Sequence, residues 1–461
     1  MQRSAFNLAM ETSADETTLV VNTAVNAAAS AFSAWSRWPT SERALVLEKM
    51  MAVLNDHRVE FCALAAEEVG ASKSWTEFNI DLAIGMLAHV ASLAPALEDH
   101  QVVDPQTGKR SIIRRQAAGV VLGMVPWNAP ITLGVRAIAG ALMCGNTAVM
   151  KGSEHCPKTH QHLVDALNSA GLPEGVLTCV VSRPEEAHDT MVQLIAHPCI
   201  RRINFTGSTR VGRDVAMEAA RYLKPALLEL SGKAPLIVLD DADLDAAVEA
   251  ACFGAFFNQG QICMSTDWII VVKSVADAFV AKLQVRTQQI RAADPVHEVT
   301  VLGRMISAEA AQRVNGLIED AVSKGAQLLV GGQIDGCVMQ PALLDGIAAN
   351  MRIYREETFG PLASIMRVHD AEEAVSIAND SEFGLNAAVF SNDLSRAQSI
   401  ADRLEYGVVQ INGPTVHDDP SMPFGGMKNS GYGRFGGEQA INEFTELRWI
   451  ATHQEGHTPT L

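Results

Sequence analysis

Cys263 is the residue of this chain best placed to act as a nucleophile. It lies in a short polar segment, Phe257 to Ser265, which joins a helix-like apolar run, residues 246–257, to a strand-like run, 268–272. A thiol on a turn between two regular elements can be reached by a substrate, and nucleophiles often lie at such places. The alternative is an inert buried cysteine, the commoner role of this side chain, so the other motifs must decide between the two.

Glu229 and Asn128 are two polar residues that could assist such a nucleophile. Glu229 lies in an apolar run, residues 227–230, where burial would raise the pKa of its carboxyl towards neutrality, as a general base requires. Asn128 lies between Pro126 and Pro130 at the end of an apolar strand, where its amide could donate a hydrogen bond to an oxyanion. The alternatives are an edge-strand glutamate that faces water and a rigid turn without a catalytic role.

Two strand-to-helix turns have the composition of a nucleotide-binding site. Gly207 permits a tight turn after a strand, and the helix that follows it offers free N–H groups to a phosphate. The spacing Gly-x-x-x-x-Gly, from Gly207 to Gly212, is neither the dinucleotide fingerprint nor a P-loop. Lys151 ends another strand and Glu154 follows it by three residues, so that both could bind the hydroxyls of a ribose. The alternatives are an ordinary turn that contains glycine and a surface lysine.

The composition excludes several classes of function. A chain of 461 residues with 48% hydrophobic and 19% charged residues predicts more than one globular domain. The net charge of −17, without a basic stripe, predicts that the protein does not bind nucleic acid. The eight cysteines never occur as Cys-x-x-Cys, so we predict neither a metal site nor a disulfide framework. No apolar run has the length of a transmembrane helix and the N-terminal segment lacks the pattern of a secretory signal, so we expect a cytoplasmic protein that binds no membrane.

The order of strand-like and helix-like segments predicts an α/β protein. Residues 16–100 are predicted to be helical, with one helix capped by the hydroxyl of Thr40 or Ser41, and residues 101–116 to form a hairpin with its turn at 104–108. Short apolar strands then alternate with helices from 119 to 238, ending with a strand at 236–239, which predicts a doubly wound parallel sheet.

A second alternating region follows, from residue 246 to about 412. It is predicted to contain helices over 301–324, and a strand is predicted further on, at 448–452. The sequence therefore predicts two α/β units, with Cys263 near the beginning of the second.

Seven motifs, in their order and spacing, resemble the NAD(P)-dependent aldehyde dehydrogenase superfamily over about residues 20 to 450. They are Pro126-Trp-Asn, Lys151-x-Ser-Glu154, Phe205-Thr-Gly-Ser-Thr, Glu229-Leu-Ser-Gly-Lys, Asn258-Gln-Gly-Gln-Ile-Cys263, Glu356-Glu-Thr-Phe-Gly-Pro361 and Pro423-Phe-Gly-Gly-x-Lys428. The resemblance implies the α/β aldehyde dehydrogenase fold. It has a Rossmann-like cofactor domain (residues 1–100 and 118–230), a second α/β catalytic domain (231–428) and a small β oligomerisation element (101–117 and 438–461). It also implies a homodimer or homotetramer.

The resemblance further implies roles for individual residues. Cys263 would attack the aldehyde to form a thiohemiacetal and then a thioester, within an oxyanion hole made by the Asn128 amide and the Cys263 backbone N–H. Glu229 would activate the water that hydrolyses the thioester. The cofactor would be NAD, since the Glu154 carboxylate would repel the 2′-phosphate of NADP. The implied cofactor-binding residues are Val125, Pro126, Trp127, Lys151, Glu154, Phe205, Gly207, Ser208, Val211, Gly212, Leu230, Glu357 and Phe359.

Two C-terminal segments, 412–426 and 430–437, resemble the branch of the family that oxidises salicylaldehyde, vanillin and benzaldehyde. A planar ring requires an apolar slot, and five apolar residues near the motifs are candidates for its walls: Trp75, Met86, Phe257, Ile262 and Met264. The alternatives are an aliphatic aldehyde or semialdehyde dehydrogenase of the same mechanism, a CoA-acylating enzyme and a non-enzymatic relative. Glu229 disfavours the acylating enzyme, because acylating relatives commonly lack this base, and the presence of all three catalytic residues disfavours the non-enzymatic relative.

The chain departs from the family pattern in three places. Gly152 stands where a proline is common, which loosens the turn after Lys151. Trp268 stands where an arginine is usual, so an ion pair is expected to be lost and Asp267 to need another partner. The family's first strands are expected to be incomplete in this sequence.

Overall fold

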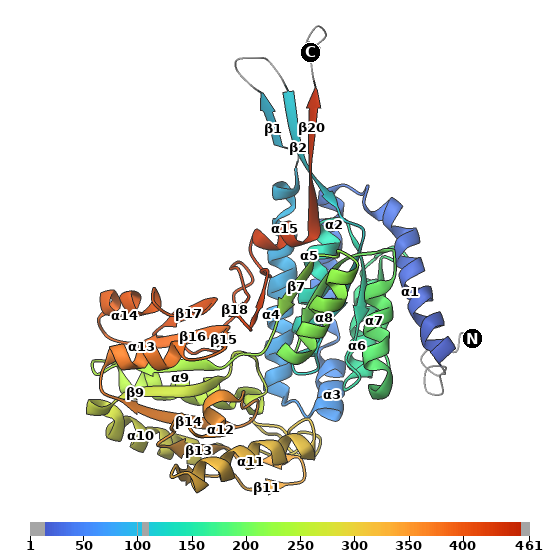
Figure 1. The fold of residues 1–461 in the computed structure, drawn as a ribbon. Helices are drawn as coiled ribbons and strands as arrows, with labels where there is room; N and C mark the ends of the chain where they lie inside the picture. Colours follow the sequence, from blue (N-terminus) through green and yellow to red (C-terminus); the bar gives the residue numbers. More distant parts are fainter. Residues whose placement is uncertain (1–13, 99, 104–109, 453–461) are drawn as a thin grey trace.

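The computed structural model describes residues 14–98, 100–103 and 110–452, which form two α/β units and a projecting β-sheet (Figure 1). The first unit contains a six-stranded sheet in the order β19-β7-β6-β3-β4-β5. All neighbours in it are parallel except β19, which pairs antiparallel with β7. Its strands are β3 (Val120–Met124), β4 (Thr147–Lys151), β5 (Leu177–Val180), β6 (Ile200–Thr206), β7 (Ala226–Glu229) and β19 (Gly431–Tyr432).

Helices cover both faces of this first sheet, because its strands are apolar on both sides. Val121 of β3 packs into one core, while Val120 and Leu122 pack into the other, as the alternation of side chains along a strand requires. The first core includes α2 (Thr40–Asp56), α4 (Lys73–Ser92), α5 (Pro130–Met143) and α6 (Pro157–Ser169), and α3 (Arg58–Val69) packs beside them. The second core includes α1 (Ala14–Trp35), α7 (Ala187–Ala196) and α8 (Thr209–Arg221).

The second unit contains a seven-stranded sheet in the order β10-β13-β14-β9-β8-β16-β17, parallel except for the pair of β10 and β13. Its strands are β8 (Ala234–Val238), β9 (Thr266–Val272), β10 (Gln327–Val330), β13 (Ala342–Asp345), β14 (Leu362–Val368), β16 (Asn386–Phe390) and β17 (Val408–Ile411). Helices α9 (Leu244–Phe256) and α10 (Lys273–Gln288) pack on one face; α11 (Ala308–Ser323), α13 (Ala371–Asn379) and α14 (Leu394–Ala401) pack on the other. The 3-10 turn η4 (Phe257–Gly260) follows α9 and leads to Cys263.

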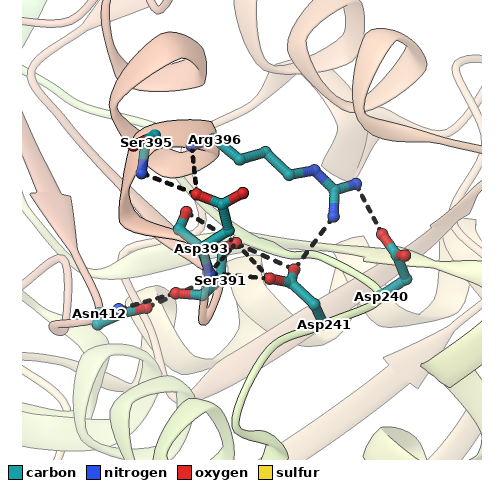
Figure 2. Close-up of polar contacts among 7 residues, drawn as sticks. All are labelled: Asp240, Asp241, Ser391, Asp393, Ser395, Arg396 and Asn412. Carbon is teal, nitrogen blue, oxygen red and sulfur yellow. Dashed lines mark hydrogen bonds and ion pairs between the residues drawn. The ribbon is translucent and has the colours of Figure 1, made fainter.

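A polar network at the carboxyl ends of β8, β16 and β17 holds these strands to α14 (Figure 2). The Ser391 hydroxyl donates to the Asp241 carboxylate at 2.7 Å, and Arg396 forms ion pairs with both Asp240 and Asp241. The Asn412 side chain accepts from the Ser391 N–H and donates to its carbonyl. Each of these groups has its partner within the network, so we assign it a structural role.

The third sheet projects from the body of the molecule and consists of β1 (His100–Val103), β2 (Arg110–Ala117) and β20 (Thr445–Thr452) (Figure 1). The predicted hairpin and C-terminal strand are therefore confirmed; the turn predicted at 104–108 lies outside the described residues. Leu447 and Trp449 of β20 are 64% and 68% exposed, so this sheet presents apolar side chains to its surroundings.

Three sequence predictions about these elements were wrong. The helix that begins at Thr40 has Pro39 at its N-cap and no side-chain cap, so no hydroxyl caps it. The strand predicted at 236–239 forms β8 of the second sheet, because the four residues between β7 and β8 are too few for the crossover that a parallel neighbour in the same sheet would need. Helix α11 begins only at Ala308, after Ser307 caps it by accepting from the Ala310 N–H at 3.1 Å; residues 301–307 are not helical.

Candidate active site

A cavity of about 310 Å³ lies where the two α/β units meet and contains Asn128, Glu229 and Cys263 together. Its walls come from the carboxyl ends of β3, β6 and β7, from the segment after η4 and from the loop before β14. The residues that line it are Pro126, Trp127, Asn128, Leu133, Thr206, Gly207, Ser208, Glu229, Ser231, Cys263, Glu357 and Phe359. The cavity thus combines a thiol, a carboxyl and an amide that are separated by up to 135 residues in the sequence.

The backbone that carries Cys263 is held rigidly. Gln259, which has a left-handed φ of 55°, accepts a hydrogen bond from the Gly303 N–H at 2.7 Å through its side chain. The side chain of Gln261 accepts from the Ile306 N–H at 2.9 Å. On the other side the Cys263 carbonyl packs against Gly232, where an added Cβ would lie 2.2 Å from that oxygen. The two glutamines and the close approach at Gly232 therefore fix the position of the thiol.

Glu229 has the electrostatic properties of a general base. It is 1% exposed, and β19 covers the edge of its strand, so the alternative of an edge residue that faces water is wrong. Both carboxyl oxygens are buried, and the Cys263 thiol and the Thr206 side chain lie close enough to act on the carboxyl as hydrogen-bond donors. Burial raises the pKa of the Glu229 carboxyl to about 7, against the opposing positive charge of Arg136. A carboxyl that titrates near neutrality can accept a proton in one step and release it in the next.

The Cys263 thiol is protonated at neutral pH. Burial, and then the negative charge of Glu229, raise its pKa well above the usual value. A thiol with this pKa needs a proton acceptor before it can attack. Glu229 is the carboxyl whose charge acts most strongly on it.

Asn128 is held from behind by two side chains. The Trp75 indole N–H donates to the Asn128 carbonyl at 2.9 Å, and the Asn258 amide donates to the same oxygen at 3.1 Å. The Asn128 side-chain amide donates to the Gln261 carbonyl at 3.0 Å, two residues before Cys263. The orientation of this amide at the cavity wall is thus set by the same segment that carries the thiol.

A second cavity, of about 430 Å³, runs along the carboxyl ends of β3, β4 and β6. Among the residues predicted to bind the cofactor, those that line it are Val125, Pro126, Trp127, Lys151, Glu154, Phe205, Gly207, Ser208 and Val211. Glu357 and Phe359 line the first cavity, which shares Gly207 and Ser208 with the second. Gly212 and Leu230 line neither cavity and instead pack together, since an added Cβ on Gly212 would lie 2.3 Å from the Leu230 side chain.

Lys151 and Glu154 form an ion pair in the second cavity. The Lys151 ammonium lies 3.3 Å from the Glu154 carboxylate, and Lys151 is only 8% exposed, so it is not a surface lysine. Burial alone would raise the pKa of Glu154, but the charge of Lys151 lowers it below its usual value. The carboxylate is therefore ionised at neutral pH. Ser208 caps α8 by accepting from the Val211 N–H at 3.4 Å, which places the N-terminus of that helix at the same cavity.

The loop that carries Glu357 and Phe359 is held by a buried ion pair. The Lys233 ammonium lies 3.5 Å from Asp267 and donates to the Glu356 carbonyl at 2.7 Å, while Asp267 accepts from the Thr358 N–H at 3.2 Å. The partner that the sequence could not name for Asp267 is thus Lys233. Burial raises the pKa of the Glu357 carboxyl, which accepts from the Gly232 N–H, to about 7.

Trp268 is fully buried behind this loop. Its ring packs 5.1 Å from that of Tyr354, and the Lys233 ammonium lies 5.4 Å from its centroid. It lines neither of the two cavities, so its side chain belongs to the packing behind the site.

Four of the five residues predicted for a substrate slot gather in one apolar cluster with Cys263: Trp75, Phe257, Ile262 and Met264. Phe78, which the sequence analysis missed, stacks 5.6 Å from Trp75 in the same cluster. The structure places Met86 elsewhere, in the core around α5.

Arg136 is a residue of the site that the sequence analysis missed. It forms a buried ion pair with Asp418, and its positive charge lowers the pKa of both Glu229 and Cys263 against the effect of burial. The signal was available in the sequence, because Arg136 is the single charged residue in the otherwise apolar helix α5. In the described part of the chain, no group of three or more metal-ligating side chains could hold a metal ion. No described helix is long and apolar enough to cross a bilayer.

Comparison with known proteins assigns this fold and site to a class. The sequence pattern of the aldehyde dehydrogenase family matches residues 7–450. The vanillin dehydrogenase of Pseudomonas fluorescens is 52% identical over 433 residues, which are 94% of this chain and 89% of that protein. The salicylaldehyde dehydrogenase of Pseudomonas putida is 46% identical over 428 residues, 93% of this chain and 89% of that protein.

A solved structure agrees with these matches. The crystal structure of a salicylaldehyde dehydrogenase from Pseudomonas putida G7, complexed with salicylaldehyde, superposes with a TM-score of 0.94. It is 43% identical in sequence, and the match covers 96% of this chain and 92% of that one. The chain belongs to the aldehyde dehydrogenase family and has the aldehyde dehydrogenase fold. It is therefore an oxidoreductase that acts on aldehydes.

Proposed function

We propose that this enzyme oxidises an aromatic aldehyde to its carboxylic acid with NAD, through a thioester on Cys263. The observation that carries the proposal is the single cavity in which the Cys263 thiol, the Asn128 amide and a Glu229 carboxyl of raised pKa face the same space. The names of the vanillin and salicylaldehyde dehydrogenases that this chain resembles support the aromatic substrate. So does the aromatic cluster of Trp75, Phe78 and Phe257 beside the thiol.

The residues of the site can perform each step that the protein must supply. Glu229 takes the proton of the Cys263 thiol as the sulfur bonds to the carbonyl carbon of the aldehyde, forming a thiohemiacetal. The Asn128 amide and the Cys263 backbone N–H stabilise the negative charge on its oxygen. The nicotinamide, when bound, supplies the acceptor for the hydride. Glu229 releases the thiol proton to solvent and then accepts a proton from water as the water attacks the thioester. That proton passes to the departing sulfur, and the carboxylic acid leaves with Cys263 restored as a thiol.

The lining of the second cavity fits a dinucleotide, and the charge of Glu154 favours NAD. Lys151 and the N-terminus of α8 supply donors to ribose hydroxyls and phosphate oxygens. The Glu154 carboxylate is ionised and paired with Lys151, so a 2′-phosphate placed there would meet a negative charge. The Lys233–Asp267 ion pair would hold Glu357 and Phe359 in place to contact the nicotinamide ribose.

We also propose the domain division that the resemblance implies, and assembly through the third sheet. The sheet of β1, β2 and β20 projects from the body and exposes Leu447 and Trp449. Contact between copies of the chain would bury these side chains and the free strand edges. Light scattering on the Trp449→Lys variant should show a smaller particle than the wild-type homodimer or homotetramer.

The direct test is NADH formation, followed at 340 nm, with purified enzyme, NAD and a panel of aldehydes. The panel contains salicylaldehyde, vanillin, benzaldehyde, hexanal and succinic semialdehyde. We expect turnover of the aromatic members well above the aliphatic ones, no turnover in Cys263→Ala and wild-type turnover in Cys337→Ala, a matched cysteine outside both cavities. A preference for the aliphatic members would overturn the aromatic assignment, turnover only with added CoA would overturn the hydrolytic step, and no turnover at all would overturn the activity.

A further inference from the structure

The turn after Lys151 contains a glycine whose side-chain space is already occupied. A Cβ on Gly152 would lie 3.0 Å from the Cβ of His160 and 3.2 Å from its Nδ1. The Gly152 N–H donates to the Val180 carbonyl at 2.9 Å, so Gly152 continues the hydrogen bonding between β4 and β5. Gly152 and His160 are therefore complementary: the first leaves room and the second fills it.

His160 also supplies the hydrogen bond that shapes this turn. Its ring is completely buried on α6, and Nδ1 accepts from the Ser153 N–H at 3.0 Å. Ser153 lies between Gly152 and Glu154, so this bond fixes the backbone directly before the carboxylate that pairs with Lys151. No other acceptor for the Ser153 N–H is found among the described residues, so loss of the ring nitrogen would leave a buried donor unpaired.

The protonation state of His160 suits this task. Burial and the nearby charge of Lys151 lower the pKa of the imidazole to about 3, against the raising effect of a hydrogen bond to the backbone of Pro130. The ring is thus neutral at physiological pH, with Nδ1 as the acceptor and the proton on Nε2. Pro130 lies two residues beyond Asn128, so the same ring connects the ribose turn to the turn that carries the oxyanion-hole amide.

We propose that His160 is a positioning residue for the dinucleotide, which holds the Lys151–Glu154 pair in the geometry that binds the adenosine ribose. This inference rests on the proposed function, since that function places NAD in the second cavity. His160 lines neither cavity. It acts through the Ser153 N–H and through the volume that Gly152 leaves open.

Two variants separate the hydrogen bond from the volume. His160→Leu fills a similar space without an acceptor, whereas His160→Asn carries an amide oxygen that can replace Nδ1 as acceptor for the Ser153 N–H. His162→Leu is the matched control on the same helix, because His162 packs against Phe61 and His57, away from the turn. For each enzyme we would measure the Kd for NAD by calorimetric titration without aldehyde. We would also measure the KM for NAD, kcat and the melting temperature.

We expect His160→Leu to raise the Kd and KM for NAD about tenfold, as for loss of one hydrogen bond that leaves a buried donor unpaired. We expect kcat to change less than about twofold, His160→Asn to recover most of the affinity and His162→Leu to bind as the wild type does. An unchanged Kd in His160→Leu, or equal losses in the Leu and Asn variants, would overturn the positioning role. If the positioning role is overturned but the wild type oxidises aldehydes with NAD, the proposed function stands without a role for His160. If the wild type binds neither NAD nor NADP, both proposals are wrong.

Discussion

The pH dependence of kcat is the property that the structure predicts most specifically. Glu229 acts as a base only when it is ionised, and burial raises its pKa to about 7. When hydrolysis of the thioester limits turnover, kcat follows the ionised fraction. That fraction is about 0.1 at pH 6, 0.5 at pH 7 and 0.9 at pH 8 for a pKa of about 7. An unshifted glutamate, with a pKa near 4.5, would be almost fully ionised over the same range.

A second carboxyl complicates the assignment, because burial also raises the pKa of Glu357 to about 7 and it lines the same cavity. The assay is therefore a kcat profile from pH 5.5 to 8.5 at saturating NAD and aldehyde, for the wild type, Glu229→Gln and Glu357→Gln. We expect about a tenfold rise in kcat from pH 6 to pH 8 in the wild type. The same rise should persist in Glu357→Gln, and only a low, pH-independent rate should remain in Glu229→Gln. A flat wild-type profile, or a rise that survives in Glu229→Gln and disappears in Glu357→Gln, would refute the assignment of Glu229 as the base.

Further expectations follow from neighbouring contacts. Lys233→Met leaves the Asp267 carboxylate buried without its ion-pair partner. Urea unfolding should show a free energy of unfolding lower by about 3–5 kcal/mol, and the KM for NAD should rise. An unchanged unfolding midpoint would contradict this. Glu154→Gln removes the charge that opposes a 2′-phosphate, so the ratio of kcat/KM for NADP to that for NAD should rise about tenfold, and a constant ratio would count against the role of the carboxylate. Asn128→Ala should lower kcat about 10²- to 10³-fold with little change in the KM for NAD, measured at 340 nm. Because the pKa of Glu229 is higher in the folded than in the unfolded protein, its protonation contributes to the free energy of unfolding. This contribution is fully present below pH 4.5 and is lost as the pH rises through 7. Between pH 4.5 and 8 the free energy of unfolding of the wild type should therefore fall by about 3 kcal/mol relative to that of Glu229→Gln. If the free energies of unfolding of the two proteins changed equally with pH, the raised pKa of Glu229 would be contradicted.

Much of the fold could be predicted because buried parallel strands and their helices leave simple patterns. Lys151 was predicted to end a strand and is the last residue of β4, and the alternation of strands and helices predicted from residue 119 onwards agrees with the elements from β3 to β7. The sheet to which β8 belongs could not be predicted, because the residues of a strand do not determine which other strands it pairs with. Its assignment depended on the length of the connection from β7.

The properties of a candidate site residue could be predicted where its neighbours in the sequence determine its environment. Glu229 in an apolar run is such a case, and its burial and raised pKa agree with the sequence argument. The supporting contacts could not be predicted, because they join residues far apart in the chain. Asp267 pairs with Lys233, 34 residues away in the sequence, and Trp75 holds the Asn128 carbonyl across 53 residues. Met86 was proposed from neighbourhood alone, and the structure places it in a different core.

The proposed mechanism requires covalent attachment of the substrate to Cys263, and the resulting acyl group can be observed directly. Wild-type enzyme and Glu229→Gln are mixed with vanillin and NAD and quenched in acid within seconds, and the digested peptides are analysed by mass spectrometry. We predict an added vanilloyl group on the peptide that carries Cys263, at a low level in the wild type and at higher occupancy in Glu229→Gln, where hydrolysis is slowed. Steady NADH formation without an adduct on Cys263, or an adduct on another of the eight cysteines, would contradict catalysis through Cys263.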